Sequence, residues 1–277
     1  MRDIAENAQL ALLLEVSGTP KPGNVDRHRE YDDLRFEQFM AGAVGSLPGL
    51  RMAAEGGAVG DAFERAVEGM SGQSGGNTQF GALLSIVPLV SAAATDRLGS
   101  EGVTAVVEET TVGDACSFYR AFDHVDVAVD DPPADLDDLD VRRGGDATEA
   151  IRDRGLTLSG IMDRSADRDG VAAEWVRGFE RSFEAAGWLL ADDGPVYKRA
   201  SRAFLRLLAA ERDTFIVTRN GESAATEATR RARAVLEGSE DADALAEAFV
   251  ERDINPGTTA DLTAAALFIA LERGLEV

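Results

Sequence analysis

Apolar residues recur at helical spacing along most of the chain. Ile4, Ala8, Leu12 and Val16 lie about one turn apart, and the pattern ends at the glycine- and proline-rich stretch 18–23. We therefore expect a first helix that ends before residue 18. The same spacing predicts further helices over 36–47, 59–70, 77–90, 103–108, 114–122, 171–188, 196–210, 222–236, 242–252 and 259–272.

Two short stretches also suit β-strands. Residues 125–129 alternate Val-Asp-Val-Ala-Val, and residues 214–218 are rich in β-branched side chains. Neither stretch has enough partners to build a sheet, so the predicted fold class is all-α. With 277 residues, 44% of them hydrophobic, we expect one compact multi-helix domain over 1–277. The Asp- and Pro-rich span 129–145 predicts an acidic surface loop.

The charge balance narrows the possible partners. Fifty acidic residues against 28 basic ones give a formal net charge of −22, which argues against nucleic-acid binding through a broad basic surface. Only Lys21 and Lys198 are lysines. An acidic, lysine-poor chain suits a halophilic cytoplasm, where a Debye length of about 3 Å at 1 M salt screens self-repulsion.

Several generic sites and signals are absent. Neither lysine follows a Gly-x-x-x-x-Gly run, and His28 and His124 form no His-Glu-x-x-His zinc motif. The single Cys116 permits no internal disulfide and predicts a buried structural thiol. The apolar stretch 81–94 is too short to span a bilayer, and the acidic N-terminus is unlike a signal peptide. We therefore expect a cytoplasmic protein without membrane contact.

The segment 20–26 reads Pro-Lys-Pro-Gly-Asn-Val-Asp. Its two prolines stiffen the turn and its glycine permits unusual backbone angles, which together set the directions of Lys21, Asn24 and Asp26. A lysine retained here predicts a positive charge directed at an anionic ligand. The alternative is a solvated turn that happens to contain a lysine.

A second segment joins Glu68 and Met70 to a glycine-rich loop that ends at Asn77. Because Asn77 is a good N-cap, the glycines lie just before a helix N-terminus, where free amides and the helix dipole favour anions. This arrangement predicts phosphate binding. The alternative is a flexible connector between two helices.

Two further segments lie near the C-terminus. Asp213 and Arg219 flank an apolar run. In one interpretation Asp213 binds a metal or a ribose and Arg219 binds a phosphate. In the other the two form a buried structural ion pair. The segment 255–262 reads Asn-Pro-Gly-Thr-Thr-Ala-Asp-Leu. Here Thr258 and Asp261 have nearly the spacing of a capping box, so helix capping and ligand binding are both open.

Together these segments resemble the triphosphoribosyl-dephospho-coenzyme A synthases in order and approximate spacing. Each motif alone is weak, but four in order are specific and cover most of the chain. The matching patterns are Pro-Lys-Pro-Gly-x-Val-Asp at 20–26, Glu-x-Met with Asn-Thr-x-x-Gly within 68–81, Asp-Thr-x-x-x-x-Arg at 213–219, and Asn-Pro-Gly-x-x-Ala-Asp-Leu at 255–262.

The resemblance implies an all-helical transferase that uses ATP as a substrate, with Mg²⁺. Such an enzyme attaches ribose C1 of ATP to the 2′-hydroxyl of 3′-dephospho-coenzyme A, releases adenine, and makes a prosthetic-group precursor for lyase acyl carrier proteins. This chain has Gln79 and Phe80 where the family commonly has His and Lys. The alternatives are a divergent nucleotide- or phosphoribosyl-using enzyme with another acceptor, or a non-catalytic nucleotide-binding protein; a homodimer is left open.

The resemblance also assigns candidate roles. Carboxylates stabilise the oxocarbenium character of a breaking ribosyl bond, and one can take the proton of the attacking hydroxyl. The predicted catalytic residues are Asp26, Glu68 and Asp261. The predicted nucleotide-binding residues are Lys21, Asn24, Gly75, Gly76, Asn77, Thr78, Arg219 and Asn255. The predicted metal ligands are Asp26, Glu68 and Asp213.

Overall fold

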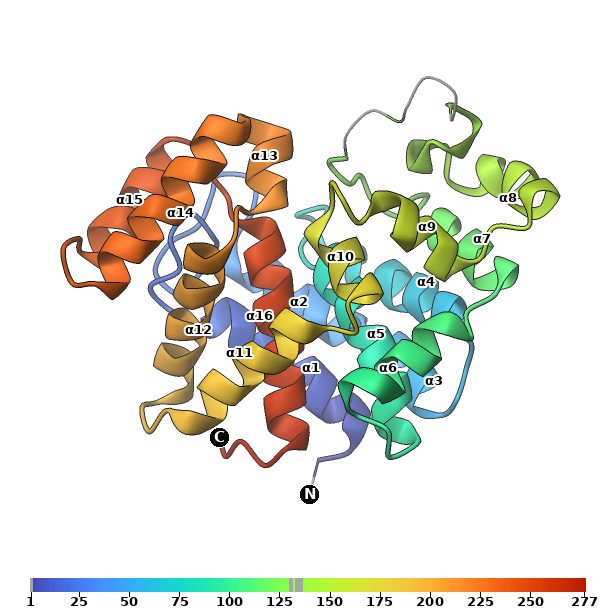
Figure 1. Ribbon diagram of the computed structural model, residues 1–277, viewed down its shortest axis with the longest axis horizontal. Coiled ribbons are helices and arrows are strands. Elements are labelled where there is room, and N and C mark those ends of the chain that lie inside the picture. The colour runs from blue at the N-terminus through green and yellow to red at the C-terminus, as the bar shows by residue number, and fades with distance from the viewer. Residues whose placement is uncertain (1, 130–131, 133–136) are drawn as a thin grey trace.

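The computed structural model describes residues 2–129, 132 and 137–277 (Figure 1). Within these ranges all regular structure is helical, which confirms the predicted fold class. The helices are α1 (Ile4–Ser17), α2 (Phe36–Gly45), α3 (Leu47–Ala54), α4 (Val59–Met70), α5 (Phe80–Ala94), α6 (Ser100–Glu108), α7 (Val112–Ala121), η1 (Asp137–Leu139), η2 (Val141–Ala147), α8 (Thr148–Arg154), α9 (Leu158–Ser165), α10 (Gly170–Val176), α11 (Glu180–Ala191), α12 (Val196–Ala210), α13 (Thr214–Asn220), α14 (Glu222–Leu236), α15 (Ala242–Glu251) and α16 (Gly257–Glu272).

Two helices run through the middle of the molecule. Helix α16 is buried along nearly its whole length, and its many alanines let α1, α5, α11 and α12 approach it closely. Helix α5 is also apolar on all sides and contains Pro88. A helix that is hydrophobic all round belongs in a core. Figure 1 accordingly shows α16 flanked by other helices on both sides.

The remaining helices form two groups on either side of this centre. Helices α12 to α15 pack around their own apolar cluster, which includes Phe204, Ile216 and Phe249. Helices α4 and α6 pack onto α5, α7 packs onto α4, and α8 and α9 pack onto α7; all of them belong to the main core. In Figure 1 the first group lies at the left and the second at the right.

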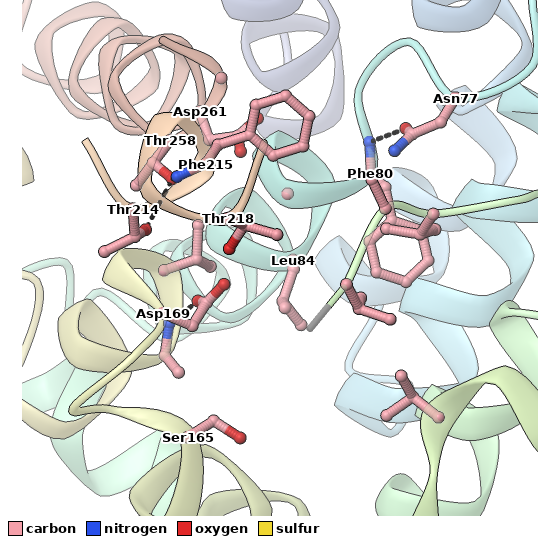
Figure 2. A pocket seen from close by; sticks show the side chains of 18 of the residues that line it. Asn77, Phe80, Leu84, Ser165, Asp169, Thr214, Phe215, Thr218, Thr258 and Asp261 are labelled. Atoms are coloured by element: carbon pink, nitrogen blue, oxygen red, sulfur yellow. Dashed lines mark hydrogen bonds between the residues drawn. The ribbon is translucent and has the colours of Figure 1, made fainter. Parts of the chain in front are cut away.

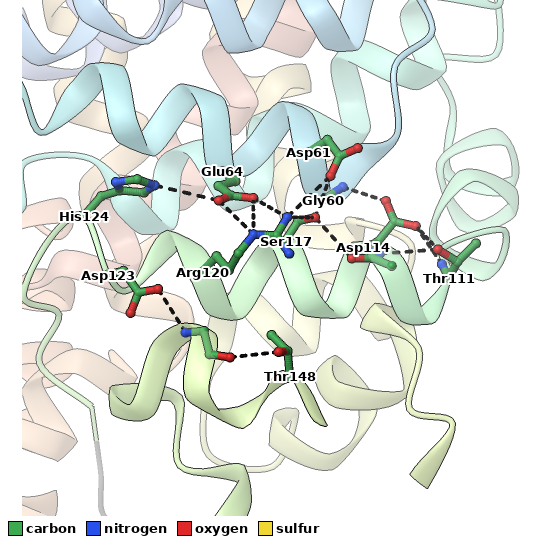
Figure 3. Close-up of polar contacts among 12 residues, drawn as sticks. Gly60, Asp61, Glu64, Thr111, Asp114, Ser117, Arg120, Asp123, His124 and Thr148 are labelled. Carbon is green, nitrogen blue, oxygen red and sulfur yellow. Dashed lines mark hydrogen bonds and ion pairs between the residues drawn. The ribbon is translucent and has the colours of Figure 1, made fainter. Parts of the chain in front are cut away.

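A polar network joins α4 to α7 (Figure 3). The guanidinium of Arg120 donates to both oxygens of Glu64, with Nη2 to Oε2 at 2.6 Å. Ser117 Oγ donates to Asp61 Oδ1 at 2.6 Å. Two-point contacts of this kind fix the rotation of a helix, and here they hold the aromatic face of α7 toward the core.

Most predicted helices are confirmed, and the exceptions have local causes. The helix predicted over 171–188 is wrong: it is divided into α10 and α11 because Gly178 and Phe179 both have positive φ. Residues 214–218 lie in α13, and 125–129 have no regular structure. Residues 130–131 and 133–136 of the predicted acidic loop lie outside the described ranges.

In the described part of the chain, every helix is too short or too polar to cross a bilayer. Cys116 is buried as predicted, on the inner face of α7.

Candidate active site

A cavity of about 550 Å³ lies where the two helix groups face each other (Figure 2). This volume is typical of small-molecule sites. The first residues of α5, α10, α13 and α16 line it, together with residues of α7 and α9. The predicted site residues that line it are Asn24, Asn77, Thr78, Asn255 and Asp261.

Two sides of the cavity differ in chemistry. We call five residues the polar wall. Thr214, Thr258 and Asp261 line the cavity, and the buried Asp213 and Thr259 join α13 to α16 behind them. We call the facing residues of α7 and its C-cap, of α9, and of the turn between α8 and α9 the apolar wall: Phe118, Phe122, Leu156, Ile161 and Met162.

Asp213 ties the polar wall together. One oxygen accepts from the amide of Ile216 at 3.0 Å and so caps α13. The other accepts from the amide and hydroxyl of Thr259, both at 2.7 Å, and so caps α16 as well. Because these donors occupy both oxygens, Asp213 acts in this structure as a double helix cap.

The threonines of this wall bind each other. The hydroxyls of Thr214 and Thr258 lie 2.9 Å apart (Figure 2), and Thr214 also accepts from the amide of Gly170 at 3.0 Å. These bonds connect the start of α10 to the starts of α13 and α16.

Asp261 lies against the first turn of α5. The amide of Ala82 hydrogen-bonds to its carboxylate. A Cβ atom at Gly81 would lie only 2.1 Å from Asp261 Oδ2, so this contact requires glycine at position 81. The motif glycine of the second segment thus makes room for the motif aspartate of the fourth.

Burial raises the pKa of Asp261 well above its usual range, and the nearby carboxylates of Glu15, Asp213 and Asp169 raise it further. Desolvation likewise raises the pKa of Glu15 and of Asp213. A cavity carboxyl with a raised pKa is suited to proton transfer near neutral pH.

The first segment lies directly behind the cavity. Lys21 is fully buried, and its ammonium binds Glu15 and donates to Asn24 Oδ1 at 2.9 Å. Asn24 in turn donates to Asn255 Oδ1 at 3.0 Å. Lys21 therefore neutralises a buried acid that lines the cavity and does not line the cavity itself.

Asp26 is occupied by its own turn. It accepts hydrogen bonds from the Thr19 hydroxyl at 2.9 Å and from the amides of Lys21, His28 and Arg29 at 3.1, 2.8 and 3.0 Å. Because the loop consumes both oxygens, Asp26 holds the turn together and does not line the cavity.

Only part of the second segment reaches the cavity. Asn77 Oδ1 accepts from the amide of Phe80 at 3.0 Å (Figure 2). The predicted N-cap is nevertheless wrong, because α5 begins at Phe80 and Gln79 holds its N-cap position without a side-chain cap. Glu68 is exposed on α4 and pairs with Arg65. Glu68, Gly75 and Gly76 are absent from the described lining of the cavity.

Two side chains after Asn77 have unsatisfied polar atoms. The hydroxyl of Thr78 and both amide atoms of Gln79 are buried without a partner among the described residues. Gly42 on α2 lies against both side chains, so any added Cβ there would collide with them. Unpaired buried polar atoms are costly, so this end of the cavity calls for water or ligand atoms.

The other predicted charges lie apart. Arg219 is 46% exposed and pairs with Asp253. Asp26, Glu68 and Asp213 have separate sets of partners, and the described residues contain no cluster of three or more His, Cys, Asp or Glu side chains that could hold a metal ion. The predicted metal ligands therefore do not fit a resident Mg²⁺ as placed here.

Several lining residues escaped the sequence analysis. Glu15 lies within the first helix, where it resembles any helical acid. Arg164, Arg168 and Asp169 lie in a stretch that carries no recognisable motif. Among the lining residues without a motif, only Phe118 and Phe122 had a recognisable pattern in the sequence. Their helical spacing predicted packing in the core and gave no indication of a binding site.

The fold and the cavity define a class: an all-α protein whose helix N-termini surround a small-molecule site with a buried carboxyl. The CitG family model, described as ATP:dephospho-CoA triphosphoribosyl transferase, matches residues 1–276. The chain therefore belongs to this family of transferases.

A solved structure agrees with this assignment. The chain is similar to a protein of Archaeoglobus fulgidus named provisionally as a triphosphoribosyl-dephospho-coA synthase, with 27% identity and a TM-score of 0.68. The match covers 85% of this chain and 99% of that one. No curated protein matches the chain.

Proposed function

We propose that this protein transfers the triphosphoribosyl group of ATP to the 2′-hydroxyl of 3′-dephospho-coenzyme A and releases adenine. One observation carries the proposal: residues from all four motif segments meet at one cavity, where Asp261 lies against Gly81 and Asn24 binds Asn255. Four motif segments that are far apart in the chain and meet at one cavity are the arrangement that binding of a shared ligand requires.

Asp261 is our candidate for the general base. In the transfer, the acceptor 2′-oxygen forms a bond to ribose C1, and the C1–N bond to adenine breaks with its electron pair leaving on the base. Asp261 takes the hydroxyl proton, and adenine takes a proton from solvent. The raised pKa of Asp261 favours the first proton transfer.

The neighbouring acidic side chains can stabilise the ribose of ATP during transfer. Positive charge develops at C1 as the ribosyl bond breaks, and nearby carboxylates stabilise it. Glu15 and Asp169 line the same cavity as Asp261. ATP enters this acidic site as its magnesium salt, so the metal arrives with the substrate.

A second candidate function is the same donor chemistry with another acceptor. Phe80 supports it, because its ring packs on Phe122 and Phe63 with centroids 4.7 and 5.0 Å apart. The position is thus part of an aromatic cluster, whereas a lysine there would bring a positive charge. An acceptor with a larger apolar part than dephospho-coenzyme A suits this cluster.

The test is adenine release from magnesium ATP, followed by chromatography, with and without 3′-dephospho-coenzyme A. We expect acceptor-dependent adenine and a product whose mass equals the acceptor plus triphosphoribose. ATP binding without adenine release, across a panel of nucleoside and pantetheine acceptors, would contradict catalysis and leave a nucleotide-binding protein.

We also propose a halophilic cytoplasmic setting, supported by the net charge of −22. The assay therefore uses molar KCl. Higher activity and a higher melting temperature in 2 M than in 0.1 M KCl are expected, because salt at about 1 M shortens the Debye length to about 3 Å. Greater stability at low salt would contradict the adaptation.

A further inference from the structure

The charge around the cavity is unevenly distributed. Among the described residues that line it, Arg164 and Arg168 are the only cations. Four carboxylates also line it: Glu15, Asp140, Asp169 and Asp261. Any phosphate group that enters the site therefore has two side-chain cations available, and both come from one short segment.

Arg164 lies in the last turn of α9, and Arg168 follows four residues later in the turn that leads to α10. Both are exposed, and neither guanidinium has a hydrogen bond or an ion pair among the described residues. Other arginines, such as Arg120 and Arg202, pair with carboxylates. Without a carboxylate partner, these two exposed arginines form no ion pair that would stabilise the fold, and both are available to an anion.

The same segment supplies apolar surface. Ile161 and Met162 precede Arg164 on α9, are 7% and 3% exposed, and belong to the apolar wall. Phe118 on α7 and Phe122 at its C-cap continue that wall, with ring centroids 5.3 Å apart. A cationic end thus adjoins a long apolar strip.

We infer that Arg164 and Arg168 bind the diphosphate of the acceptor and that the apolar wall carries its pantetheine arm. This inference rests on the proposed function. The triphosphate of ATP ends in charge and has no apolar group beyond it. Dephospho-coenzyme A joins a diphosphate directly to a long, mostly apolar arm, which matches two cations beside an apolar strip.

The first test is the Arg164→Gln/Arg168→Gln double variant in steady-state kinetics, with each substrate varied in turn. Loss of two charge-assisted contacts should raise KM for dephospho-coenzyme A roughly 10- to 100-fold and leave KM for ATP within about twofold. Arg51→Gln is the matched control, because Arg51 is exposed on α3 and lines a different surface. An effect on KM for ATP alone would overturn the inference, as would no effect on either substrate.

The second test uses 4′-phosphopantetheine, which carries the arm and one phosphate but no nucleoside. It should inhibit competitively against dephospho-coenzyme A and not against ATP. Met162→Gln keeps the side-chain volume but adds an amide, and it should weaken this inhibition about tenfold. Competition with ATP, or equal inhibition of the variant when its melting temperature is unchanged, would sink the assignment of the wall.

Binding calorimetry separates the two proposals. If the wild-type protein binds dephospho-coenzyme A and the double arginine variant does not, the subsite stands even where no adenine is released. If adenine is released normally and the variants bind the acceptor like wild type, the proposed reaction stands and the subsite is overturned.

Discussion

The polar and apolar walls of the cavity are held in different ways. The polar wall is a closed set of hydrogen bonds, in which Asp213 caps two helices and Thr214 binds Thr258. The apolar wall is held by ring packing and, from behind, by the Arg120–Glu64 contact. Hydrogen bonds fix atoms to within tenths of an ångström, whereas apolar packing selects shape. We propose that the first wall positions the chemistry and the second selects the ligand.

Asp261→Asn should give the largest effect, because it removes the base of the polar wall. We expect transfer to fall by roughly 10²- to 10⁴-fold with little change in KM for either substrate. In the wild type, activity should decline as the pH falls through the raised pKa of Asp261, because only the ionised form takes a proton. Asp153→Asn, an exposed acid on α8, is the control. Full activity of Asp261→Asn would exclude Asp261 as the base.

The same variant should unfold at a higher temperature near neutral pH. The folded-state pKa of Asp261 is raised, so the stability that goes with its protonated form is present at low pH and lost as the pH rises. Asn keeps the neutral form, so its advantage should grow by roughly 1.4 kcal/mol per pH unit between the unfolded-state and the folded-state pKa of Asp261, and stay constant above the folded-state pKa. Melting curves of the variant and the wild type at pH 4 and 8 measure this advantage. Equal differences in melting temperature at both pH values would contradict the raised pKa as its cause.

Lys21→Met should destabilise the fold, by about 3 to 5 kcal/mol, because it leaves Glu15 buried without its partner. Lys198 is the other lysine and is exposed, so Lys198→Met is the matched control. Adding Glu15→Gln should recover much of the loss. Wild-type stability together with weakened ATP binding would instead support the predicted phosphate-binding role of Lys21.

Gly81→Ala should displace Asp261, because the new Cβ would lie 2.1 Å from Oδ2. A shift of about 1 Å at a reacting group costs on the order of 100-fold in rate. Gly187→Ala on α11 is the control, since no atom lies within 4 Å of its added Cβ. Equal activity of the two variants would show that the Gly81–Asp261 contact is not needed.

Arg219→Gln should change least. Arg219 is exposed and pairs with an exposed Asp253, so we expect less than about 0.5 kcal/mol in unfolding free energy and less than about twofold in KM for ATP. A tenfold rise in KM for ATP would instead support the nucleotide-binding role that the sequence predicted for Arg219.

The sequence was most informative where a structural feature depends on a local pattern of residues. Helical spacing gave α4, α12 and α14 at their observed ends, because one apolar face is enough to predict a helix. It failed over 171–188, where Gly178 and Phe179 turn the backbone to positive φ. The motif segments pointed to Asp261 and Asn255, which do line the cavity, and also to Glu68, which does not.

The sequence by itself determined the all-α class, the family and the four segments that meet at the cavity, because these depend on residue type and spacing along one chain. Only the tertiary structure decided which charges face the cavity. Lys21 was turned inward by Glu15, while Arg164 and Arg168, which carry no motif, were brought to the cavity. The reason is physical: periodicity predicts the face of a helix, but the burial of a charge, its partner and its pKa depend on residues that are distant in the sequence.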